Sequence, residues 1–148
     1  MNRLASSASP QTCSAVAMTR ARRSVRSLGE LTEIVSHGLP KSALRYCVVR
    51  VVSDPRERRE VMCRIVPAAT YKRRKQHLRP EESERTERLA RVIATAEHVW
   101  GDAEEARRFM TGAHPELNGK TPLETSYAEL GARQVEELLW KLFYGLPA

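Results

Sequence analysis

Residues 65–75 read Ile-Val-Pro-Ala-Ala-Thr-Tyr-Lys-Arg-Arg-Lys, and this stretch decides the fold prediction. The apolar pair Ile65-Val66 ends one amphipathic segment, and Pro67 breaks the chain before a second short helix begins. Four successive cations complete the stretch. Two helices joined by such a short turn, with cations on the second helix, are typical of a helix-turn-helix that faces a polyanion.

The last six residues of this stretch are the candidate DNA-binding residues: Thr70, Tyr71, Lys72, Arg73, Arg74 and Lys75. At 100° per residue the four cations span a full helical turn, so they cannot all face one groove. We expect one or two of them to reach base edges while the others bind phosphates, to which Thr70 can also donate. A solvated cationic face is the structural alternative. Tyr71 is the lone aromatic residue here, so stacking on single strands is not indicated.

The charge of the chain divides into a basic first part and an acidic second part. Residues 1–80 contain 17 Lys and Arg against 5 Asp and Glu, a net charge of +12. Residues 81–148 contain 8 against 13, a net charge of −5. A basic surface favours nucleic acid or an anionic membrane, both of which would repel the acidic part. The two parts are therefore expected to have different partners.

Catalysis, metal binding and membrane insertion are not indicated by the sequence. The three cysteines have no C-x-x-C spacing and no neighbouring histidine, which argues against a zinc site and a disulfide scaffold. No histidine stands near a Ser or Cys in a nucleophile arrangement, and no Gly-rich phosphate loop occurs. No apolar run approaches the roughly 18–20 residues of a transmembrane helix. We therefore predict a cytoplasmic, non-enzymatic protein with no catalytic residues, no metal and no cofactor.

The apolar pattern predicts an all-α protein in three parts. Residues 1–27 are rich in Ser, Ala and Arg, contain no acidic residue, and are predicted to be a disordered basic tail. An organelle transit peptide and a translation start at Met18 are the alternatives for this segment. Residues 28–80 are predicted to hold the helix-turn-helix, and residues 81–148 a small C-terminal helical domain.

The clearest helix is predicted from Pro80 to Gly101, with acidic residues in its first turn where the helix dipole favours them. One apolar stripe follows it at helical spacing: Leu89, Val92, Ile93, Ala96, Val99 and Trp100. Earlier helices are expected at about residues 31–38, 40–52, 57–66 and 68–76, although the Val-rich end of the second could be a strand. Later come a helix capped by Asp102, a loop over residues 111–121, and a last helix that stops at Gly145.

The C-terminal segment is the second candidate binding site, and we take its residues to be Trp140, Tyr144, Gly145, Leu146, Pro147 and Ala148. Residues 144–148 are apolar and carry no charged side chain. Trp140 lies beside the apolar stripe of the last helix, so the core does not require it. Aromatic residues at an accessible helix edge are frequent interface anchors. Packing within the domain is the alternative interpretation.

From about Leu31 to Ala148 the chain resembles the Xre/MbcA/ParS-type antitoxins, the partners of RES-domain toxins. The resemblance rests on residues 65–75, on Leu-Arg-Pro-Glu-Glu-Ser-Glu-Arg at 78–85, on residues 89–102, on Asn-Gly-Lys-Thr-Pro-Leu-Glu at 118–124, and on residues 131–145. The chain departs from the family pattern at three positions. Phe109 replaces the usual Trp, Ala128 replaces Thr or Ser, and Tyr71 replaces a small aliphatic residue.

The resemblance implies a bacterial type II toxin–antitoxin module. Such an antitoxin is a homodimer through its N-terminal half, binds double-stranded operator DNA to repress its own operon, and occludes the active site of a toxin that consumes NAD. Residues 28–80 would then bind DNA and dimerise, and residues 81–148 would bind the toxin, with the C-terminal segment covering its pocket. Two alternatives are a stand-alone helix-turn-helix regulator whose C-terminal domain only dimerises, and an adaptor whose basic helix no longer reads DNA.

Overall fold

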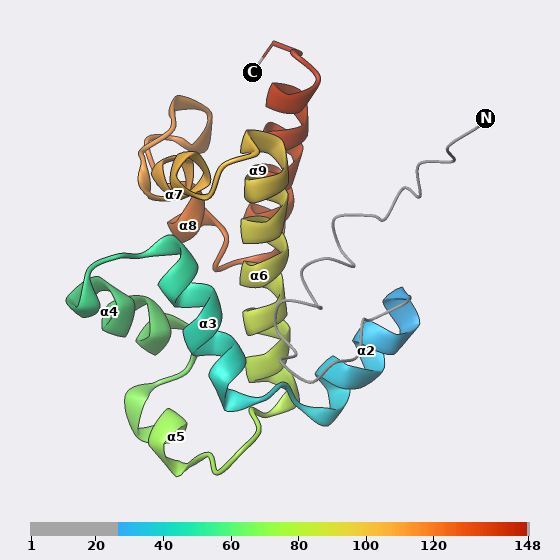
Figure 1. The fold of residues 1–148 in the computed structure, drawn as a ribbon, viewed down its shortest axis with the longest axis vertical. Coiled ribbons are helices and arrows are strands. Elements are labelled where there is room, and N and C mark those ends of the chain that lie inside the picture. The colour runs from blue at the N-terminus through green and yellow to red at the C-terminus, as the bar shows by residue number, and fades with distance from the viewer. Residues whose placement is uncertain (1–26, 148) are drawn as a thin grey trace.

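The computed structural model describes residues 27–147, and all of their regular secondary structure is helical (Figure 1). The predicted all-α class is therefore confirmed for this part of the chain. The elements, in chain order, are α2 (Leu28–His37), α3 (Lys41–Val51), α4 (Pro55–Ile65), α5 (Ala68–Arg73), α6 (Pro80–Trp100), α7 (Ala103–Thr111), the 3-10 turn η1 (Pro115–Leu117), α8 (Pro122–Thr125) and α9 (Glu129–Phe143).

The long helix α6 is the axis of the molecule, and α2, α3, α4, α7 and α9 all pack against it (Figure 1). Pro80 occupies the first turn, and the Glu82 carboxylate accepts from the free Arg79 N–H at 2.9 Å. The helix ends at Gly101, whose φ of 66° is left-handed and favours glycine. Both predicted boundaries of this helix are confirmed.

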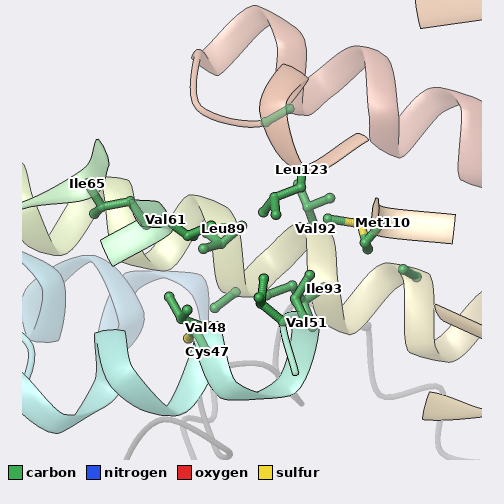
Figure 2. Packing of buried hydrophobic residues seen from close by; sticks show 14 of the residues in the cluster. Cys47, Val48, Val51, Val61, Ile65, Leu89, Val92, Ile93, Met110 and Leu123 are labelled. Atoms are coloured by element: carbon green, nitrogen blue, oxygen red, sulfur yellow. The ribbon is translucent and has the colours of Figure 1, made fainter. Parts of the chain in front are cut away.

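The apolar core forms around the middle of α6. Figure 2 shows Val48 and Val51 of α3, Val61 of α4 and Met110 of α7 meeting Leu89, Val92 and Ile93 of α6. The same buried cluster continues through Ala132, Val135, Leu138 and Leu139 of α9. It thus includes residues from both predicted regions, 28–80 and 81–148. The division of the chain into these two functional regions stays a prediction.

Four local expectations need correction or refinement. The Val-rich end of α3 is helical, because Val48 and Val51 pack against α6 as a helical face. Helix α4 starts at Pro55, where the Asp54 carboxylate caps it, two residues earlier than expected. Helix α5 ends at Arg73 and not at residue 76, and Arg74 is already extended. The predicted loop over residues 111–121 contains η1.

The predicted basic tail lies almost wholly outside the described residues. Its last residue, Ser27, is described, and its side chain caps α2 by accepting from the Glu30 N–H at 3.2 Å. None of the described helices is long and apolar enough to span a membrane.

Candidate functional sites

Of the predicted DNA-binding residues, Lys72, Arg73 and Lys75 are exposed to solvent. Lys72 and Arg73 lie in the last turn of α5, and Lys75 lies in the loop beyond it. Thr70 is half-buried. Three cations therefore remain available for a polyanion, whereas Tyr71 and Arg74 have contacts within the protein.

Tyr71 holds α5 against α3. Its hydroxyl donates to the Lys41 carbonyl oxygen at 3.1 Å, and the Lys41 ammonium lies 4.4 Å from the centre of its ring. The ring also packs against the core, and burial raises the pKa of the Tyr71 phenol. Tyr71 therefore anchors the basic segment, a role that its neighbours in sequence do not reveal.

Arg74 forms an ion pair within the protein. Its guanidinium donates to both carboxylate oxygens of Glu82, at 3.0 and 2.7 Å, and Glu82 lies in the first turn of α6. The hydrogen bond from Arg74 lowers the pKa of Glu82 in spite of partial burial. Two-point pairs of this kind fix direction as well as distance. Arg74 thus ties the end of the basic segment to α6.

Backbone contacts complete this attachment. The Lys41 N–H donates to the Gln76 carbonyl at 2.8 Å, and the Leu78 N–H donates to the Leu39 carbonyl at 2.9 Å. These bonds join the α5–α6 loop to the turn between α2 and α3. At that turn, a Cβ on Gly38 would lie 2.3 Å from the Leu78 carbonyl oxygen, so a side chain there would push the two segments apart.

The C-terminal segment is ordered by the end of α9. The Leu146 N–H donates to the Lys141 carbonyl at 2.9 Å and the Gly145 N–H to the Leu142 carbonyl at 3.2 Å, with Gly145 at φ 64°. This pair of bonds is a Schellman motif, and it confirms Gly145 as the predicted helix stop. Tyr144 and Leu146 are 68% and 56% exposed, and Pro147 is exposed too. Ala148 lies outside the described residues.

Two groups of aromatic side chains lie near the C-terminal end of α6. The first, which we call the tail cluster, comprises His98, Trp140, Phe143 and Tyr144. Its ring centres are separated by 5.2 to 6.1 Å along the contacts. Trp140 is half-buried within it, and Phe143 is exposed.

The second group, which we call the flank cluster, comprises Trp100, Phe109 and His114, with successive ring centres 5.8 and 6.0 Å apart. Trp100 ends the predicted apolar stripe of α6, and the residue is 41% exposed, unlike the buried members of that stripe from Leu89 to Ala96. Val99 is half-buried as well. The apolar stripe is buried as far as Ala96, and α6 extends about one turn beyond its last buried residue.

Charged residues that the sequence analysis did not single out fasten α9 to α6. Arg88 of α6 donates to Glu129 at 2.7 Å, and Arg91 donates to Glu136 at 2.8 Å. Arg91 also lies 3.9 Å from Glu87 on its own helix. Burial raises the pKa of Glu87, an effect that Arg91 partly offsets. Residues 27–147 contain no group of three or more His, Cys, Asp or Glu side chains placed to hold a metal ion.

The chain is similar to a known protein family and to a curated protein. Residues 95–145, which include both aromatic clusters, match the family model of the antitoxin Xre/MbcA/ParS C-terminal toxin-binding domain. The curated Antitoxin Xre of Pseudomonas putida is 32% identical over 119 residues, which make up 78% of this chain and 72% of that protein. The class is therefore that of a small helical antitoxin with a C-terminal toxin-binding domain. The chain belongs to the Xre/MbcA/ParS antitoxin family.

Proposed function

We propose that this antitoxin covers the active site of a RES-domain, NAD-consuming toxin with its C-terminal end. We further propose that it represses its own operon in the cytoplasm by binding operator DNA as a homodimer. The chain acts by binding alone and supplies neither a catalytic group nor a cofactor. In this proposal, residues 28–80 bind DNA and the second copy of the chain, and residues 81–148 bind the toxin.

The observation that carries the toxin interface is the exposed, preformed end of α9. Tyr144 and Leu146 are large apolar side chains left in solvent by a backbone that the Schellman motif already orders. A preformed apolar segment loses little conformational entropy on binding. The net charge of −5 over residues 81–148 also suits a pocket that attracts the phosphates of a dinucleotide.

The DNA proposal rests on the three exposed cations Lys72, Arg73 and Lys75. Lys72 and Arg73 end α5, and Lys75 follows it. Helix α5 comes after α4 and a turn at Val66-Pro67, the order expected of a helix-turn-helix. In Figure 1 this basic segment and the end of α9 lie at opposite ends of the molecule. That separation supports simultaneous binding of DNA at one end and of the toxin at the other.

Toxin binding is tested by co-expression with the RES-domain toxin and measurement of cellular NAD. The full chain should keep NAD at its normal level, and a chain with Tyr144→Ala and Leu146→Ala should not. Leu130→Ala is the matched control, since Leu130 is an 80% exposed apolar residue of α9 at the other end of that helix. If the double variant protects NAD as well as the control does, the C-terminal segment is not the toxin-binding site.

DNA binding is tested with Lys72→Ala combined with Arg73→Ala, because neither side chain has an ion-pair partner among the described contacts. Operator affinity should fall, and its dependence on salt should become shallower by about one unit for each lost phosphate contact. Protection of NAD should be unchanged. A chain that binds its operator but no toxin would be a stand-alone regulator, and one that binds toxin but no DNA would be an adaptor.

A further inference from the structure

The end of α6 presents an aromatic surface that the C-terminal segment does not include. Trp100 is the last residue of α6, and the left-handed Gly101 turns the chain directly into α7. One side of the Trp100 ring meets Phe109 of α7, and 41% of the side chain remains in solvent. His114 extends the same surface on the far side of Phe109.

This flank cluster lies on the opposite side of α6 from the tail cluster. His98, which belongs to the tail cluster, and Trp100 are two residues apart, which is a rotation of about 200° around the helix. A toxin that admitted only the tail would contact one side of the helix end and leave Trp100 in water. Large aromatic side chains are enriched among the residues that contribute most to protein interfaces.

We propose that the toxin closes over both sides of the end of α6, with Trp100 and Phe109 as a second contact surface beside the tail. This inference rests on the proposed function, because it takes the toxin as the partner. The toxin is the expected partner of the flank cluster because all three of its residues lie within residues 95–145, the segment that matches the toxin-binding domain. The last turn of α6 also carries a member of each cluster, His98 of the tail cluster and Trp100 of the flank cluster.

The two sides make different contributions to such an interface. The tail cluster is carried by α9, and the flank cluster by the α6–α7 junction, so the two can be altered separately. Asp102 begins α7 by accepting from the N–H groups of Glu104 and Glu105, both at 2.9 Å, and this cap fixes the junction that carries Trp100. A second surface on a fixed junction adds affinity without ordering more chain.

The first test is the affinity of the purified toxin for Trp100→Ala, Tyr144→Ala and the double variant. Each single change should weaken binding by about 30-fold, the loss typical of a central aromatic contact. The two losses should multiply in the double variant, because the sites do not touch. Leu130→Ala should bind like the unaltered chain, and thermal unfolding should show that Trp100→Ala is folded.

The second test reports contact directly. The chain contains two tryptophans, so 5-fluorotryptophan labelling gives two 19F resonances, which Trp100→Phe assigns. Unlabelled toxin should shift both resonances and shield both from a soluble paramagnetic quencher. A shift of the Trp140 resonance alone, with Trp100→Ala binding at full affinity, would overturn the second surface while leaving the proposed function intact. Shielding of Trp100 without toxin at high chain concentration would assign the surface to a second copy instead. If the unaltered chain binds no RES-domain toxin, both proposals fail.

Discussion

The basic segment at one end of the molecule and helix α9 at the other are held by different kinds of contact. Helix α5 has no buried residue, and its attachment comes from the Tyr71 ring, the Arg74–Glu82 ion pair and backbone bonds of the following loop. Helix α9 buries a full apolar face and adds ion pairs from Arg88 and Arg91. One end depends mainly on polar contacts and the other on the core.

The difference has a consequence for how each end binds. A segment attached mainly by polar contacts opens locally at a lower free energy than one that shares the core. Under the proposed function, the basic segment would adjust to the DNA backbone, whereas α9 presents its last residues in a fixed direction. Changes in the core should disable the whole protein, and changes in the polar attachment should affect only the basic end.

The largest effect is expected from Leu139→Ala in α9. Leu139 is fully buried, and its truncation leaves a cavity that lowers the free energy of unfolding by about 2–5 kcal/mol. Urea unfolding followed by circular dichroism measures the loss. Leu130→Ala, on the exposed side of the same helix, should change stability by less than about 0.5 kcal/mol. Equal effects of the two changes would contradict the assignment of the core.

Gly131→Ala should come next. A Cβ at this position would lie 2.0 Å from the Thr125 carbonyl oxygen, so α8 and α9 must separate to admit it. Overpacking of this kind lowers stability by about 1–3 kcal/mol. Gly29→Ala is the control, because its nearest neighbour would be 3.8 Å away and alanine favours helices. Thermal unfolding should separate the two variants, and an unchanged Gly131→Ala melting temperature would refute the close approach.

Arg74→Ala should loosen the basic segment alone. Hydrogen exchange should accelerate at the amides of residues 68–78, because the pair with Glu82 is lost, while α9 keeps its protection. Arg73→Ala is the matched control. The Arg73 side chain is exposed. Its removal should therefore weaken the proposed DNA binding without changing hydrogen exchange at residues 68–78. Faster exchange in Arg73→Ala would mean that the segment is held differently.

The same attachment should weaken in acid. The pKa of Glu82 is lowered in the folded protein, so its pairing stabilises the fold above the ordinary glutamate pKa of about 4.3. That stabilisation is lost as the pH falls through the lowered value. The difference in free energy of unfolding between the unaltered chain and Glu82→Gln should accordingly be greatest at neutral pH and disappear in strong acid.

The smallest effect on stability is expected from Glu87→Gln. Its dependence on pH should be opposite in sign to that of Glu82→Gln. Burial raises the pKa of Glu87, so the folded state holds this proton more tightly than the unfolded state does. The contribution to stability is present below the ordinary pKa and is lost as the pH rises through the raised value. Glu87→Gln should therefore gain stability relative to the unaltered chain with rising pH.

Local chemistry accounts for the features that the sequence predicts well. Pro80, Gly101, Asp102 and Gly145 set helix ends through their own backbone or side-chain preferences, and each acts as expected. The roles of Tyr71 and Arg74 could not be predicted in this way, because their partners belong to other elements. Helical spacing likewise places Trp100 on the apolar stripe but does not show where the neighbouring helices end. Exposure of that residue depends on tertiary packing alone.

The buried thiol of Cys47 has a practical consequence. Burial raises its pKa to about 12, so almost none of it is the reactive thiolate at neutral pH. Cys63, by contrast, is exposed on α4. Alkylation of Cys63 should be immediate, and alkylation of Cys47 should await an opening of the core. Peptide mass spectrometry of the two modifications would then measure the rate at which the core of the antitoxin opens. Measured on the complex with a toxin, the same rate would report how often the bound antitoxin unfolds locally.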